Sequence, residues 1–101
     1  MSLTTSTTLA STDGGKHYYY TLSNTPTITI PASTVTNFAT GTAINIVNQG
    51  TTNINISAAA GVTLYLAGNS TPGNRVLATY GVATLQKVAS DTWFVVGVGL
   101  T

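Results

Sequence analysis

Hydrophobic and polar residues alternate along most of the chain with a period of two, and no window shows the apolar spacing of a helix. The clearest run is 26–31, in which isoleucine alternates with threonine between two prolines, a position where strands tolerate proline. This period is typical of strands with one buried face. Other segments with strand character are 3–9, 16–22, 43–47, 52–57, 61–67, 75–80, 82–88 and 93–98. The pattern predicts an all-β fold.

Turn residues separate these segments at intervals typical of sandwiches and small barrels, about 8–12 residues. The Asn48-Gln49-Gly50 turn between two alternating runs predicts a β-hairpin that pairs 43–47 with 52–57. Residues 68–74 form a loop of Gly, Asn, Ser and Pro. Asp91, with Ser90, is expected to start a turn by bonding the local backbone.

These elements predict one domain over residues 16–101, a β-sandwich or jelly-roll-like fold of about eight or nine short antiparallel strands. Residues 1–15 are rich in Ser and Thr and end in two glycines. We expect them to form an N-terminal extended arm or an edge strand.

A threonine-rich chain can also form a β-solenoid. The Thr-Ile and Asn-Ile pairs of this chain recur at no fixed period, whereas regular spacing is the mark of a solenoid. The sequence therefore favours a sandwich or barrel.

The last predicted strand is apolar on both faces, with Trp93 and Val95 on one and Phe94, Val96 and Val98 on the other. One face packs on the core. The second is covered either by a loop, a terminus or a closed barrel of the same chain, or by another copy or a larger partner.

The amino-acid composition limits the classes of function that this chain can have. Five of 101 residues are charged, and the net charge is +1, whereas charged residues make up about 25% of an average soluble domain. The chain contains no Glu and no Cys, and 21 Thr, 8 Ser and 8 Asn. The chain has no excess of basic residues that would attract nucleic acid, and it has few ionisable groups for acid–base or metal chemistry. We expect no enzyme, no catalytic residue, no cofactor and no metal. Scarce charge suits a protein that lives in an assembly.

The N-terminus lacks the basic start and apolar stretch of a signal peptide. The longest apolar run, 93–100, is less than half the length of a membrane helix. We expect a complete small gene product that is made in the cytoplasm and does not bind a membrane.

Few residues could carry chemistry. His17 would need a nucleophile and an acid beside it, and Asp13 and Asp91 are the two available acids. A polar strand residue at the sheet rim is the simpler interpretation. A Lys–Asn crosslink would involve Lys16 or Lys87, but nothing in the spacing selects them.

Aromatic residues are the better candidates for a binding site. They suit strand packing, protein interfaces or stacking on sugars. The candidate interface residues are Tyr18, Tyr19, Tyr20, Arg75, Trp93 and Phe94. Arg75, next to the 68–74 loop, is expected to bond backbone carbonyls or an acid, with an interface role second.

Segments 61–64 and 77–97 show a further pattern: an aromatic and a small residue, an alternating strand with Leu and Lys, a polar turn, and Thr-Trp leading to a Gly. The positions are Tyr80, Gly81, Leu85, Lys87, Asp91, Trp93 and Gly97. In this the chain resembles small β-rich structural modules of tailed bacteriophages, found in capsid decoration (cement) proteins and at the ends of tail-fibre or neck proteins.

The resemblance implies a non-enzymatic structural protein of the virion. The first hypothesis is a decoration protein that binds the outer surface of the phage head and stabilises contacts between coat subunits. Its partner would be the major capsid protein or another virion protein, and the chain would be a homo-oligomer, dimer or trimer. Many weakly bound copies can act together through multivalency. The alternatives are a tail-fibre or neck component and a carbohydrate-binding module for host attachment.

Overall fold

The computed structural model describes residues 2–3, 6–9, 17–21, 23–35 and 38–101. Its strands are β1 (Ser2–Leu3), β2 (Thr7–Thr8), β3 (His17–Tyr20), β4 (Thr27–Ile30), β5 (Ala43–Asn48), β6 (Ile54–Ala58), β7 (Thr63–Leu66), β8 (Arg75–Ala89) and β9 (Thr92–Leu100). No helix occurs within those ranges, and the predicted all-β class is confirmed.

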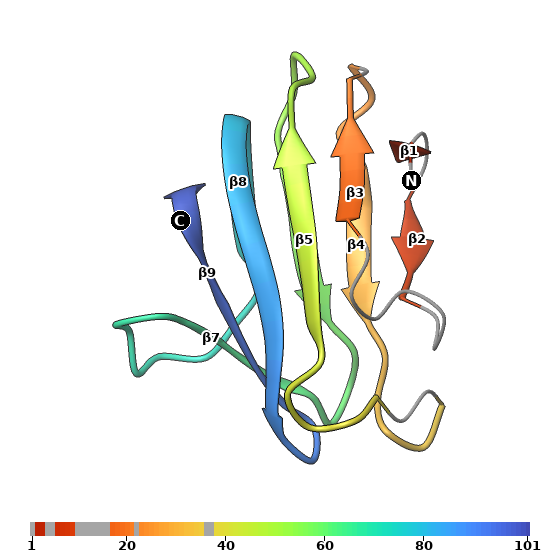
Figure 1. Cartoon of the computed structure of the whole chain (residues 1–101), viewed down its shortest axis with the longest axis vertical. Coiled ribbons are helices and arrows are strands. Elements are labelled where there is room, and N and C mark those ends of the chain that lie inside the picture. Colours follow the sequence, from red (N-terminus) through yellow and green to blue (C-terminus); the bar gives the residue numbers. More distant parts are fainter. Residues whose placement is uncertain (1, 4–5, 10–16, 22, 36–37) are drawn as a thin grey trace.

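The strands form one curled, mixed sheet that turns back on itself (Figure 1). β1, β3 and β5 make one parallel series, and β2, β4 and β6 make a second. Because the chain alternates between the two series, it winds as a coil, with β3 and β5 lying in front of β4 and β6 in Figure 1. The expectation that all strands are antiparallel is wrong, and a sandwich or jelly roll is not confirmed.

The predicted hairpin between β5 and β6 is also wrong. Within the described chain, β5 pairs with β3 and β8, and β6 pairs with β4 and β8. The link between β5 and β6 is long enough to cross the roughly 10 Å between packed sheet layers. The isoleucines of the two strands therefore meet across the core instead of side by side.

Coil length explains why no period is visible in the sequence. Ser2 lies beside Tyr19, 17 positions later, and Thr7 lies beside Ile28, 21 positions later. In the next turn of the coil, paired residues are 28 positions apart in both parallel series, as for Ile28 and Ile56. The chain therefore follows a coiled path whose successive turns differ in length, and this difference hides any fixed period in the sequence.

The long strand β8 joins the two series. Its Arg75–Leu77 end pairs antiparallel with β6, and its Val82–Gln86 part pairs antiparallel with β5. The segments 75–80 and 82–88, predicted as separate strands, are thus one strand that bends near Tyr80. β9 returns antiparallel along β8 after the predicted turn, and β7 pairs parallel with β9.

The core lies inside the curl. Its largest fully buried side chains are Trp93, Tyr20, Leu9, Ile28, Ile30, Ile44, Ile46, Ile54, Ile56, Leu64, Leu77 and Leu85. Trp93 packs edge-on against Phe38, with ring centroids 5.4 Å apart. Each fully buried large apolar side chain contributes about 1.5–3 kcal/mol of transfer free energy, so the isoleucines and leucines supply most of the driving force.

The N-terminal segment 1–15, predicted as an arm or edge strand, is described in part. β1 and β2 are the last strands at the two ends of the hydrogen-bonded order. Residues 10–16, which include Asp13 and Lys16, lie outside the described residues.

Candidate functional site

The side chains that point away from the core on β3, β5, β8 and β9 form a continuous surface, which we call the outer face. Strand register places them in rows across the sheet. The rows are Tyr19–Val47–Val82–Val98, His17–Asn45–Thr84–Val96 and Ala43–Gln86–Phe94–Tyr65. This face results directly from the alternation of the strands, because successive side chains point to opposite sides.

Several apolar side chains of the outer face are exposed. Val98 is 81% exposed, Val96 49% and Val82 48%. Scattered exposed apolar residues are normal, but a contiguous group marks an interaction surface. Val82 and Val98 are cross-strand neighbours, so these valines form a group.

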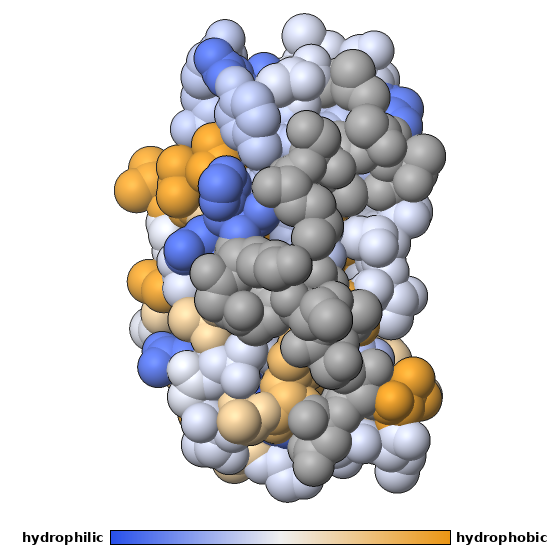
Figure 2. Space-filling view, turned by 45° about the vertical axis from the view of Figure 1, so that its right-hand side comes forward, coloured by the Kyte–Doolittle hydropathy of each residue, from blue (hydrophilic) through white to orange (hydrophobic). Residues whose placement is uncertain are grey.

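The outer face carries no charged side chain among the residues that the structure describes. Lys87 is buried on the opposite side of β8, where its Nζ donates a hydrogen bond to the Phe38 carbonyl at 2.5 Å. Asp91 lies in the β8–β9 turn and Arg75 at the start of β8. In Figure 2, a view from the β1–β2 side, separate hydrophilic and hydrophobic patches lie on a described surface of intermediate hydropathy.

Two polar side chains of the face form side-chain hydrogen bonds, one with a neighbour on the face and one with Gln49, directly after β5. The Thr84 hydroxyl donates to Asn45 Oδ1 at 2.7 Å, and the Tyr19 hydroxyl donates to Gln49 Oε1. Hydrogen bonds of this kind restrict the side chains that make them, and a restricted side chain loses less entropy when a partner binds.

The second apolar face of β9 is covered at one end and open at the other. Phe94 packs against Tyr65 of β7, with ring centroids 5.2 Å apart. Val96 and Val98 lie beyond the end of β7 and are exposed. The predicted two-faced character is thus confirmed, and the same chain covers one part of the second face.

Three of the six candidate interface residues lie in the core of the chain. Tyr18, Tyr20 and Trp93 are at most 3% exposed and belong to the core. The curled sheet encloses these three side chains, so the chain itself covers their aromatic surface. Tyr19 and Phe94 lie on the outer face, so the predicted cluster is not brought together.

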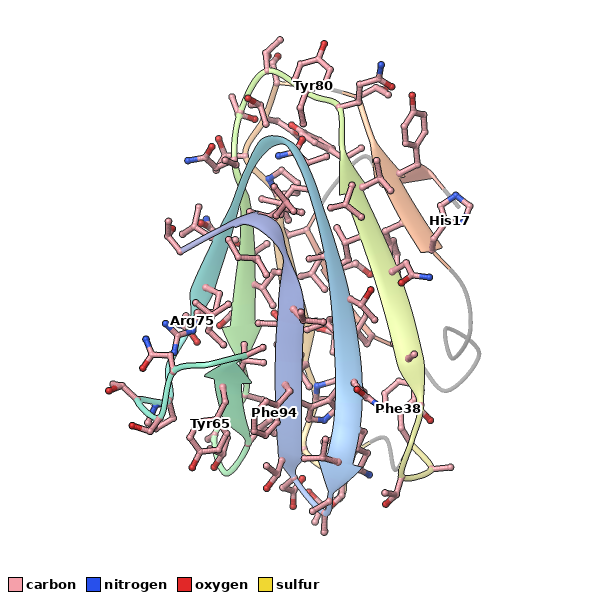
Figure 3. The ribbon with its side chains drawn as sticks, turned by 60° about the vertical axis from the view of Figure 1, so that its left-hand side comes forward. His17, Phe38, Tyr65, Arg75, Tyr80 and Phe94 are labelled. Atoms are coloured by element: carbon pink, nitrogen blue, oxygen red, sulfur yellow. The ribbon has the colours of Figure 1, made fainter. Side chains whose placement is uncertain are left out.

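Arg75 has a structural partner. Its guanidinium donates to the Thr71 carbonyl within the 68–74 loop, which agrees with the expectation of a backbone bond. The loop is also held at its base, where Gly73 N–H donates to the Leu64 carbonyl at 3.0 Å and Ala58 N–H donates to Asn74 Oδ1 at 3.0 Å. Arg75 lies away from Tyr80 and His17 in Figure 3.

Asp91 bonds a distant segment and not the local backbone as predicted. Its carboxylate accepts hydrogen bonds from the Ser33 N–H at 2.7 Å and from the Ser33 hydroxyl at 2.9 Å. These bonds hold the pKa of Asp91 below its ordinary value of 3.8, and nearby Lys87 adds to the effect.

The described residues show no arrangement for the chemistry considered above. They contain no group of three or more His, Asp or Glu side chains placed to hold a metal ion, and no pocket. His17 is exposed on the outer face, while Asp91 is engaged by Ser33. None of the described segments is a helix of the length and hydropathy needed to span a membrane.

The feature that the sequence analysis missed lies at the bend of β8. Tyr80 has a backbone φ of 62° and is 76% exposed. A bulky residue with positive φ is a conformational outlier. An aromatic residue directly before a glycine inside an apolar run was the available signal, but it does not reveal the bend.

The fold and this surface define an all-β protein with an uncharged, partly apolar sheet face. No family model matches the chain, and no curated protein and no solved structure matches it. The resemblance to phage structural modules therefore stays a prediction.

Proposed function

We propose that this chain is a non-enzymatic structural protein of a virus particle, a capsid decoration protein that docks through its outer face onto the coat subunits of the head. The observation that carries the proposal is the group of exposed valines on a face with no charged side chain among the described residues. The resemblance of segments 61–64 and 77–97 to phage modules supports the virion setting.

The energetics of such a face suit docking on a protein lattice. Burial of apolar surface contributes about 25 cal/mol per Å². Charged groups would have to lose water on docking, and that cost can exceed the gain from pairing them. The described outer face, made of aliphatic, aromatic and uncharged polar side chains with His17 at one end of a row, has no Lys, Arg, Asp or Glu that would bear this cost. Modest affinity per copy is enough when many copies bind one lattice.

A tail-fibre or neck component is the alternative within the virion, and copy number distinguishes the two. Quantitative mass spectrometry of purified particles, scaled to the major coat protein, should find hundreds of copies for a lattice-wide decoration protein. Between three and a few dozen copies would indicate the tail or neck. Absence of the chain from particles would overturn the virion proposal.

Carbohydrate binding at the aromatic residues is less well supported. Tyr18, Tyr20 and Trp93 are buried, and Tyr65 and Phe94 pack on each other, which leaves Tyr19 and Tyr80 as the exposed tyrosines. The aromatic residues therefore do not form the single platform that stacking on a sugar would use. Retention of the purified chain on a glycan array would revive this alternative.

The docking face itself can be tested with a matched pair of variants. Val96→Lys places a charge in the outer face, and Val35→Lys places one at a 76% exposed valine in the loop after β4. We expect V96K to reduce occupancy on particles at least about tenfold, because each 1.4 kcal/mol lost is tenfold in affinity, and V35K to bind normally. Equal occupancy for both variants would show that the outer face is not the docking surface.

A further inference from the structure

The backbone at Tyr80 is strained in a way that favours glycine. Its φ of 62° lies in the left-handed region, where a side chain other than that of Gly, Asn or Asp is unfavourable. Strain of this kind, about 1–3 kcal/mol, persists where the surroundings enforce it and is concentrated at functional sites. The side chain that causes the strain is itself 76% exposed, so burial of this side chain within the chain does not offset the energetic cost of the strain.

Gly81, the residue after Tyr80, has no room for a side chain. A Cβ at Gly81 would lie 2.6 Å from the Leu77 side chain and 2.8 Å from the Ala78 carbonyl oxygen. Position 81 therefore needs glycine for space, while position 80 carries a tyrosine where glycine would be relaxed.

The bend is held from inside the molecule. The fully buried Asn48 donates from Nδ2 to the carbonyl oxygens of Leu77 at 3.1 Å and Ala78 at 3.2 Å, and its Oδ1 accepts from the Gly50 N–H at 3.0 Å. These bonds join the β5–β6 turn to the bend of β8. Tyr80 is thus presented on a fixed support, which reduces the entropy lost when it binds.

Tyr80 does not stand alone. Two residues later Val82 lies beside Val98 of β9, and both are exposed. We call Tyr80, Val82 and Val98 the apical patch. In Figure 3 Tyr80 lies at the opposite end of the molecule from Tyr65 and Phe94.

We propose that the apical patch is the contact between two copies of this chain and that Tyr80 is its anchor. Tyrosine is enriched among residues that dominate interface energetics, and such residues tend to face their counterparts on the partner. In a twofold contact each patch meets itself. A patch of one aromatic and two aliphatic side chains is complementary to itself, because no like charges are brought together and no polar group of a side chain other than the tyrosine hydroxyl must lose water.

The size of the patch sets the expected strength. The three residues of the patch lie on two neighbouring strands, β8 and β9. Strands are spaced about 4.8 Å apart, so the patch covers only part of the roughly 800 Å² that each partner contributes to a standard interface. We therefore expect a reversible dimer with a dissociation constant in the micromolar range.

Sedimentation velocity of the purified full chain between about 5 and 500 µM tests the proposal. The parent should shift from monomer to dimer with concentration. Tyr80→Gly should weaken the dimer at least about tenfold and should leave the melting temperature equal or higher, because glycine relieves the strain. A purely structural role for Tyr80 predicts the opposite change in melting temperature.

Val98→Thr is a second variant that keeps the β-branched shape and tests the patch even if Y80G folds poorly. Val35→Thr is its control at an exposed valine elsewhere. We expect V98T to weaken the dimer and V35T to match the parent. A parent that stays monomeric throughout, or a Y80G or V98T variant that associates like the parent, would overturn the proposal. A dimer would cover Val82 and Val98, so docking on coat subunits would then rest on the remainder of the outer face, where Val96 lies. Because only the purified chain is used, the sedimentation result is independent of whether the chain occurs in virus particles.

Discussion

The carboxylate of Asp91 accepts two hydrogen bonds from Ser33, one from the backbone N–H at 2.7 Å and one from the hydroxyl at 2.9 Å. Asp91 lies in the turn between β8 and β9, and Ser33 lies in the loop after β4. The pair therefore ties the C-terminal hairpin to the coiled part of the chain.

This pair makes stability depend on acid pH. The folded-state pKa of Asp91 is depressed below 3.8, so its contribution to stability is present above that value and is lost as pH falls through the folded pKa. We expect the parent to be more stable than Asp91→Asn at pH 7 and this difference to shrink toward pH 2–3, as measured by thermal melts. A difference that is constant with pH would contradict the assignment.

Ser33→Ala provides the matched control. It removes one of the two donors, and the pKa of Asp91 should rise toward its ordinary value. NMR titration of the Asp91 side-chain carboxyl carbon measures this shift directly.

Gly97 is expected to tolerate no side chain. A Cβ at this position would lie 1.9 Å from the Val82 carbonyl oxygen, and this atom belongs to the backbone of the paired strand. Gly97→Ala should destabilise the fold by at least about 1–3 kcal/mol, the usual cost of overpacking, in urea denaturation.

Gly68→Ala is the comparison for that experiment. Gly68 has a φ of 84° but open space around the position of a Cβ, so its substitution costs about 1 kcal/mol of backbone strain. If both variants lose the same stability, the steric argument for Gly97 fails.

Asn48 is expected to be the most sensitive polar residue of the described core. Asn48→Ala leaves the Leu77 and Ala78 carbonyls and the Gly50 N–H without their partner, at a cost of about 1–3 kcal/mol per buried unsatisfied group. Asn48→Asp keeps the acceptor for Gly50 and loses the donors. Hydrogen exchange should show faster opening at the β8 bend in both variants, and unchanged exchange there would contradict the role of Asn48.

Trp93 should act through stability and not through a partner. Its side chain is 1% exposed and packs on Phe38, so Trp93→Ala should cost about 3–5 kcal/mol of unfolding free energy. Val96→Thr, on the same strand but exposed, should change stability by less than about 0.5 kcal/mol. A stable W93A variant would place Trp93 outside the core.

The positions of the strands could be predicted from the sequence because each depends on local alternation. The Thr27–Ile30 and Ala43–Asn48 strands are apolar on one face by their own residues. The partners of those strands could not be predicted, because the turn at Asn48 allows either a hairpin or a crossing to the opposite layer. The side chain of Asn48 and the bend of β8 act together in the observed crossing.

For the candidate site, too, local alternation predicts the two faces of a strand but not which of them is buried. Alternation along β3 places Tyr19 on one face and Tyr18 and Tyr20 on the other. Alternation does not tell which face the rest of the chain encloses, so the sequence leaves both core packing and an interface open for Tyr18, Tyr20 and Trp93.

The sequence by itself thus determined the all-β class, the strand segments, the low charge and the two-faced apolar strand at the end, because these depend on residue type and on a period of two. The tertiary structure alone decided the parallel coils, the long bent β8, the buried tyrosines and the exposed Tyr80. These depend on which strands meet across the core, and contacts between distant segments such as Asp91 and Ser33 leave no local pattern in the chain.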